Sequence, residues 1–202
     1  MEQATFEEMP LYGNEIDKAR AFMKIQEGCN NYCTFCIIPY TRGKLKSRRV
    51  EDIVKEAKRL VEHGYHEIVL TGIHLGNYGI ELLEKPNLAH VVKALLEIPG
   101  LERIRLGSIE SVEVSEELVD LMAKDPRFCT HLHLPLQAGS DHILKLMNRH
   151  YNLQEFKDLI ARLRSRIPGL AITTDIIAGF PGETDEDLSL IHISEPTRPE
   201  PI

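Results

Sequence analysis

Apolar positions along the chain alternate between helical spacing and short continuous runs. Between residues 50 and 63 the apolar side chains recur at helical spacing and Gly64 follows as a stop, which predicts a helix. Residues 67–71 then form a short apolar run, typical of a buried strand. The same pattern predicts further helices and strands along the chain. The helices lie around residues 88–96, 118–122, 143–147, 156–163 and from 184 onward, and the strands at 24–26, 103–106, 131–134 and 171–177.

Strands that alternate with helices predict a parallel sheet, either a barrel or a doubly wound sheet. Two features favour a barrel: residues 131–135 alternate His and Leu, and the last strand places Thr173 and Asp175 on one face. Strands covered by helices on both faces are apolar throughout, whereas a polar face fits a lumen that holds a ligand. We therefore predict an α/β fold, a partial (β/α) barrel with five parallel strands.

The composition is ordinary for a globular chain, since 43% of its 202 residues are hydrophobic and 27% are charged. No apolar stretch approaches the roughly 18 residues of a membrane span, and the first residues lack a signal-peptide core. We expect a cytoplasmic protein without a membrane partner. The net charge of −7 argues against a general nucleic-acid coat, but residues 42–49 contain five cations, which are either solvated surface or phosphate contacts.

Three of the four cysteines, Cys29, Cys33 and Cys36, follow the first strand with the spacing Cys-x3-Cys-x2-Cys. In a reducing compartment such a group is metal-binding or catalytic. Three thiolates can bind three irons of a 4Fe–4S cluster and leave one iron for another chelator, such as the amino and carboxylate groups of S-adenosylmethionine. The alternative is zinc, which needs a fourth ligand. No second cysteine pair is present to complete a zinc site, because Cys129 stands alone. His131 and His133 are explained more simply as polar residues that face the lumen of the barrel.

Longer stretches around these cysteines resemble a known family. The cysteine spacing resembles the radical S-adenosylmethionine (SAM) superfamily, and residues 24–43, KIQEGCNNYCTFCIIPYTRG, resemble its methylthiotransferase branch. Residues 70–79, LTGIHLGNYG, are similar to the branch members that methylthiolate C2 of N6-threonylcarbamoyladenosine next to the anticodon in tRNA. Sister groups act on isopentenyladenosine in tRNA or on a ribosomal protein. The resemblance covers residues 6–188.

This resemblance implies a reaction, its cofactors and its partners. One SAM yields a radical that removes hydrogen from adenine carbon 2, and sulfur is inserted there and methylated from another SAM. The implied cofactors are a 4Fe–4S cluster and SAM, and the implied partners are the tRNA anticodon loop and an electron donor protein. The alternatives are the two sister substrates and, outside enzymes, a zinc-binding structural module.

The resemblance also implies SAM contacts at the carboxyl ends of the strands. Phe35 corresponds to an aromatic against the adenine, Gly72 to the position beside the methionine amino group, and Gly179 to the adenine-side loop. Four polar residues at strand ends are candidates for ribose and carboxylate contacts: Ser108, Glu110, Gln137 and Ser140. Some of these are expected to be helix caps, Ser140 first among them. Asp175 is an inward polar residue, and Arg149 faces either the cofactor carboxylate or solvent.

The resemblance sets the expected domain limits. Whole enzymes of this family carry an amino-terminal domain with three further cysteines for a second cluster, and a small carboxy-terminal RNA-binding β-barrel. We expect residues 1–20 to be a linker from such an amino-terminal domain and residues 21–188 to be a radical SAM core with five of six strands. Residues 189–202 are expected to be a proline-rich, artefactual tail. On this expectation the chain alone is inactive.

Overall fold

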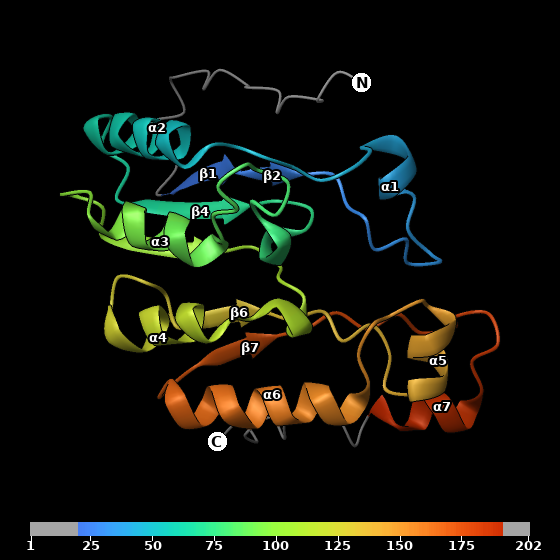
Figure 1. Cartoon of the computed structure of the whole chain (residues 1–202). Helices are drawn as coiled ribbons and strands as arrows, with labels where there is room; N and C mark the ends of the chain where they lie inside the picture. Colours follow the sequence, from blue (N-terminus) through green and yellow to red (C-terminus); the bar gives the residue numbers. More distant parts are fainter. Residues whose placement is uncertain (1–19, 192–202) are drawn as a thin grey trace.

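The computed structural model describes residues 20–191 (Figure 1), so all but the last residue of the expected linker and most of the expected tail lie outside the described residues. Five strands pair in parallel, β1 with β4, β4 with β5, and β6 with β7. Single bridges from Ile104 to Phe128 and from Ser108 to His133 join β5 to the β6 side. The strands are β1 Ala21–Lys24, β4 Glu67–Thr71, β5 Arg103–Leu106, β6 His131–His133 and β7 Ala171–Thr173. The predicted partial barrel of five parallel strands is confirmed, but its first strand ends at Lys24, whereas the sequence placed that strand at residues 24–26.

Helices connect these strands at the positions that the apolar spacing predicts. They are α2 Val50–Glu62, α3 Leu88–Leu96, α4 Glu116–Lys124, α5 Asp141–Leu146, α6 Leu153–Arg166 and α7 Asp185–Ser189. Ser115 caps α4 by accepting a hydrogen bond from the Leu118 amide, as its residue type predicts. Ser140 occupies the N-cap position of α5 but makes no capping bond. Its hydroxyl instead donates to Asp187 in α7, so this predicted cap is wrong.

Short elements fill the connections at the carboxyl ends of the strands. These are β2 Gln26–Glu27, α1 Ile38–Thr41, β3 Lys46–Ser47, η1 Leu75–Asn77 and η2 Ser111–Glu113. β2 and β3 form a small antiparallel pair around the segment with the three cysteines. Because successive strands run in parallel, all of these connections lie at one end of the sheet.

The core lies between the sheet and the helices. Ile68, Leu70 and Ile104 are fully buried in the sheet, and Ile53 and Val92 meet them from α2 and α3. Burial of such apolar area is the main favourable contribution to the folding free energy. No helix within residues 20–191 is long and apolar enough to cross a membrane.

The opposite face of β6 and β7 is polar, as the His/Leu alternation predicts. His133 Nδ1 lies 2.9 Å from Thr173 Oγ1, and His133 Nε2 lies 3.2 Å from Asp175 Oδ2. Leu132 and Leu134 are buried on the other face. The two faces of these strands therefore differ in polarity, as expected when only one face is covered by helices.

The last strand is shorter than the predicted range of 171–177, because β7 ends at Thr173. After Thr173, the chain stays paired with the segment that follows β6 through the Thr174 hydroxyl. This hydroxyl accepts a hydrogen bond from the Leu136 amide and donates one to the Leu134 carbonyl. Pro135 lies opposite and has no amide hydrogen to offer to a regular ladder. A side-chain hydroxyl thus replaces part of the backbone pairing here.

Candidate metal centre

The three cysteines lie on one loop between β2 and α1, at the carboxyl ends of the strands. Gly28 opens this loop with a φ of +72°, and a Cβ there would lie 2.0 Å from the Lys44 carbonyl oxygen, so only glycine fits. The side-chain amide of Asn148 donates to the carbonyls of Asn31 and Tyr32, both at 3.1 Å. These bonds fasten the loop to the turn after α5, and Figure 1 shows α1 and α5 at the same end of the molecule.

Cys29 contacts a buried histidine. Its Sγ lies 3.6 Å from His74 Nδ1 and accepts a hydrogen bond from the Asn31 amide at 3.4 Å. Burial opposes ionisation of the thiol, but these two contacts outweigh it and lower the pKa of Cys29. His74 is 3% exposed, and its Nε2 is paired with the Glu113 carboxylate. Burial alone would lower the pKa of His74, but Cys29 and Glu113 raise it to about 10.

Cys33 contacts a buried arginine. Arg149 Nη1 donates to Cys33 Sγ at 3.3 Å, and Nη2 of the same side chain is paired with the Glu110 carboxylate. Burial raises the pKa of Cys33 in spite of the arginine. The phenol oxygen of Tyr151 lies 3.3 Å from Arg149 Nε and 2.8 Å from the Leu136 carbonyl oxygen. Arg149 is therefore not at a solvated helix end, and the carboxylate that it faces is Glu110.

The chemistry of these side chains fits a thiolate-bound iron–sulfur cluster. Three half-buried thiols come from one loop, and two of them contact cationic side chains that favour thiolate over thiol. Among residues 20–191, no three His, Cys, Asp or Glu side chains gather around a point where a single metal ion would sit. In a cubane each thiolate binds a different iron.

Cys129 lies at the other end of the sheet. It precedes β6, and its amide donates to the carbonyl of Ile104 near the start of β5. Burial raises the pKa of its thiol, and Glu67, the first residue of β4, is among the charges that act on it. This position separates Cys129 from the cysteine loop by the length of the strands.

Phe35 and the loop that begins at Gly179, both predicted to lie near the adenine, meet through a second aromatic ring. The rings of Phe35 and Phe180 meet edge to face, with their centroids 6.5 Å apart. Phe180 follows Gly179, whose φ of +78° forms the turn after β7. The Glu183 carboxylate accepts from the amides of Gly179 and Phe180, which holds this turn closed. Two segments more than 140 residues apart thus present two aromatic rings beside the cysteine loop.

The other predicted SAM contacts are more dispersed, and their role stays a prediction. Gly72 packs tightly, because a Cβ there would lie 2.9 Å from Gln26 Oε1. Ser108 is exposed and bridges to His133, and Gln137 has a φ of +69° at a bridge to Ile176. Ser140 is buried against α7. Of the four polar candidates, Glu110 is the one that hydrogen-bonds to a partner of a loop cysteine.

The sequence placed His74 only in the stretch 70–79 that distinguishes the substrate groups, and it assigned no role to Glu113 or Tyr151. One signal was present, because His74 lies midway between Gly72 and Gly76 directly after a buried strand. Glycines spaced in this way indicate close approach of other groups to the backbone. Glu113 and Tyr151 carried no comparable signal, since their contacts join segments far apart in the sequence.

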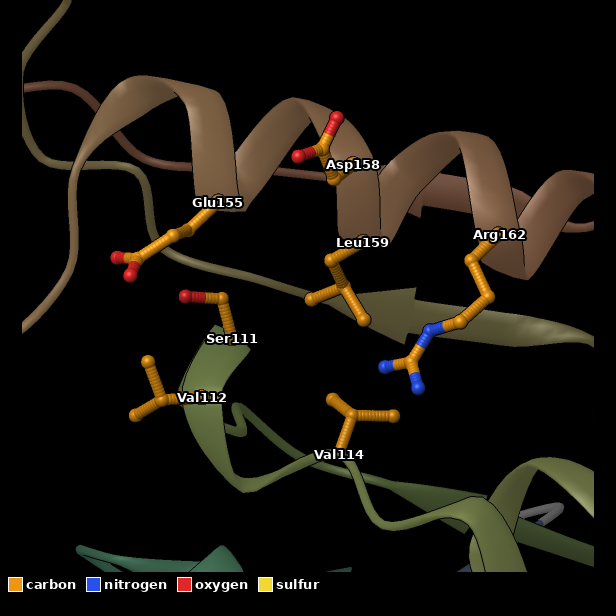
Figure 2. Close-up of a pocket in the computed structure, with 7 residues that line it drawn as sticks. All are labelled: Ser111, Val112, Val114, Glu155, Asp158, Leu159 and Arg162. Atoms are coloured by element: carbon orange, nitrogen blue, oxygen red, sulfur yellow. The ribbon is translucent and has the colours of Figure 1, made fainter.

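Two cavities differ in size and place. The larger, of about 410 Å³, lies between η2 and α6 (Figure 2) and is lined by Ser111, Val112, Val114, Glu155, Asp158, Leu159 and Arg162. It contains none of the cysteines. The smaller, of about 30 Å³, is lined by Asn31, Glu110 and Arg149 among others. The chemistry of the loop therefore lies beside the smaller cavity.

Known proteins are similar to this chain in sequence. The MtaB threonylcarbamoyladenosine tRNA methylthiotransferase of Bacillus subtilis is 48% identical over 172 residues, which are 85% of this chain and 38% of that protein. A tRNA-2-methylthio-N(6)-dimethylallyladenosine synthase of Clostridium tetani is 44% identical over 186 residues, 91% of this chain and 41% of that protein. A Thermoanaerobacter synthase of the same name is 48% identical over 181 residues. This chain thus spans about two fifths of the length of these relatives.

Solved structures share the fold. The radical SAM methyltransferase TsrM of Kitasatospora setae superposes with a TM-score of 0.67 at 20% identity, over 86% of this chain and 33% of that one. SuiB of Streptococcus suis superposes with a TM-score of 0.61 at 14% identity, over 87% and 36%. The profile of the radical SAM superfamily matches residues 23–192. This chain, with its three-cysteine loop at the carboxyl ends of a partial parallel barrel, belongs to the radical SAM superfamily.

Proposed function

We propose that this chain forms the cofactor-binding part of an enzyme that methylthiolates C2 of N6-threonylcarbamoyladenosine in tRNA. The observation that carries the proposal is the cysteine loop, in which Cys29 and Cys33 each contact a buried cationic side chain. Cys29, Cys33 and Cys36 would hold a 4Fe–4S cluster, and SAM would bind beside it. The similarity to the Bacillus subtilis enzyme over 85% of this chain supports the substrate class.

Bound together, the cluster and SAM supply one-electron cleavage of the sulfonium. The chain's own residues prepare the place for it. Arg149 and His74 stabilise negative charge on the cysteine sulfurs, while Glu110 and Glu113 compensate their positive charge. Phe35 offers an apolar edge for the adenine of SAM. The remaining contacts proposed for SAM are Gly72, Ser108, Glu110, Gln137, Ser140 and Gly179.

Within the methylthiotransferase branch, we propose threonylcarbamoyladenosine in tRNA as the substrate. The identity to a threonylcarbamoyladenosine enzyme and to a dimethylallyladenosine synthase is 48% in each case, so overall identity does not separate them. Residues 70–79 carry the distinction. Their resemblance favours threonylcarbamoyladenosine over isopentenyladenosine or a ribosomal protein. The electron donor, the cytoplasmic location, the domain limits and the inactivity of the chain alone stay predictions.

A chimera tests the substrate. Residues 20–191 replace the matching segment of the Bacillus subtilis enzyme in a strain that lacks that enzyme, and tRNA nucleosides are analysed by mass spectrometry. We expect the methylthio derivative of threonylcarbamoyladenosine to return, and a chimera with Cys33→Ala to remain without it. Methylthiolation of isopentenyladenosine alone would move the assignment to the sister group. The absence of both products from a folded, iron-loaded chimera would contradict the proposal.

Basic residues beside the cysteine loop are proposed to contact the tRNA backbone. Of the five cations between residues 42 and 49, Arg42, Lys44 and Arg49 are exposed. Arg48 is 5% exposed and paired with Glu56, so it fits neither of the two expectations for this run, solvated surface or phosphate contact. Lys46 is half-buried and lies 3.8 Å from Glu27. The exposed cations lie at the same end of the molecule as the proposed SAM site.

Reversing two of these charges tests the proposed tRNA interaction. The variant Arg42→Glu/Lys44→Glu is expected to weaken binding of an anticodon stem-loop RNA and to reduce the slope of log affinity against log salt by about 1 for each phosphate that is no longer neutralised. Fluorescence anisotropy over a salt series measures both. The control Lys93→Glu/Lys124→Glu makes the same charge change at exposed positions on α3 and α4. Equal weakening by the two variants would assign the effect to net charge.

A further inference from the structure

Two side chains, Gln26 and Glu113, pack closely against the glycines on either side of His74. A Cβ on Gly72 would lie 2.9 Å from Gln26 Oε1, and a Cβ on Gly76 would lie 2.2 Å from Glu113 Oε2. Gln26 Oε1 accepts from the His74 amide at 2.6 Å, which fixes the backbone. The glycines thus allow Gln26 and Glu113 to approach the short segment that carries this buried histidine.

The imidazole ring joins a carboxylate to a cysteine of the loop. Its Nε2 is paired with Glu113, whose other oxygen, Oε2, is buried without a partner among the described residues. Its Nδ1 lies 3.6 Å from Cys29 Sγ. A carboxylate only accepts hydrogen bonds, so Nε2 is the donor to Glu113. A metal-bound thiolate also only accepts, so a hydrogen bond between the ring and Cys29 requires a proton on Nδ1.

We propose that His74 is a positioning residue that donates an Nδ1–H hydrogen bond to the Cys29 sulfur of the bound cluster, with Glu113 fixing the orientation of its ring. This inference rests on the proposed function, because it takes Cys29 as a cluster ligand. Hydrogen bonds to sulfur stabilise the more negative, reduced form of a cluster and so raise its reduction potential. His74 therefore tunes the readiness of the cluster to accept an electron.

A redox titration of the reconstituted chain tests this. The variant His74→Leu removes the donor and keeps an apolar side chain in a buried place, and it is expected to shift the cluster to a lower reduction potential. At the potential that half-reduces the wild-type cluster, we expect the electron paramagnetic resonance signal of the reduced cluster in His74→Leu to be at most half of the wild-type signal. His74→Gln keeps an N–H donor and is expected to restore most of the potential. His63→Leu, at the exposed end of α2, is the matched control.

The outcomes separate this inference from the function on which it rests. An unchanged potential in His74→Leu, with iron still bound, would overturn the role of His74 alone. Loss of iron from His74→Leu but not from His74→Gln would support the hydrogen bond. Loss of iron from both variants would overturn it, because the Gln amide can also donate a hydrogen bond to Cys29. A wild-type chain that binds no 4Fe–4S cluster would overturn the proposed function and this inference with it.

Discussion

Alanine at Cys29, Cys33 or Cys36 is expected to abolish the 4Fe–4S cluster, while Cys129→Ala is expected to retain it. Each loop thiolate would bind a different iron, so the loss of one thiolate leaves one iron of the cluster without its protein ligand. Cys129 is another half-buried thiol, but it lies beside Ile104 and Glu67 at the amino ends of the strands. It is therefore a matched control for the loss of a thiol.

The measurement is anaerobic reconstitution followed by iron and sulfide analysis and visible absorption. The three loop variants should lose the bound iron and the brown colour, and circular dichroism should show that their secondary structure is kept. A Cys129→Ala protein without iron would contradict the ligand assignment. A wild-type protein that takes up zinc without sulfide would favour the zinc-binding alternative.

Arg149→Met is expected to destabilise the chain by about 3–5 kcal/mol, because it leaves a largely buried carboxylate without its counter-charge. The Arg149 side chain is 4% exposed and that of its partner Glu110 is 19% exposed. Removing one member of such a pair costs more than the pair contributes, since desolvation of the remaining charge is no longer offset. The variant also removes the hydrogen bonds to Cys33 and Tyr151.

Urea unfolding of the cluster-free chain measures this effect. Arg162→Met is the control, because Arg162 is 42% exposed and pairs with Glu116 on the surface, where such pairs contribute about 0–1 kcal/mol. The double variant Arg149→Met/Glu110→Leu removes both charges and is expected to recover most of the lost free energy of unfolding. Equal stability of Arg149→Met and the wild type would show that the pair is not desolvated in solution.

Local pattern predicted most of the elements. The helix over residues 50–63 is α2 to within a residue, and the run at 67–71 is β4. These segments were predictable because each buries one face or both, and burial imposes a period on the sequence that is independent of the rest of the chain. The cysteine group could also be recognised from local sequence, because one loop carries all three thiols.

Predictions that depended on neighbours distant in sequence succeeded less often. Ser140 has the residue type and position of an N-cap, yet its hydroxyl bonds to Asp187, 47 residues away. Arg48 belongs to a basic run, yet it is buried against Glu56. In each case a tertiary partner competes with the local interaction, and the local sequence does not contain that partner.

Local sequence patterns therefore specify the alternation of strands and helices, the polar face of β6 and β7, and the set of thiols. The surroundings of those thiols depend on how the βα units assemble. His74 reaches Cys29 across 45 residues and Arg149 reaches Cys33 across 116 residues. The physical reason is that parallel strands gather their carboxyl-terminal loops at one end of the sheet, so side chains from separate βα units become neighbours there. Their hydrogen bonds and compensating carboxylates arise from that assembly.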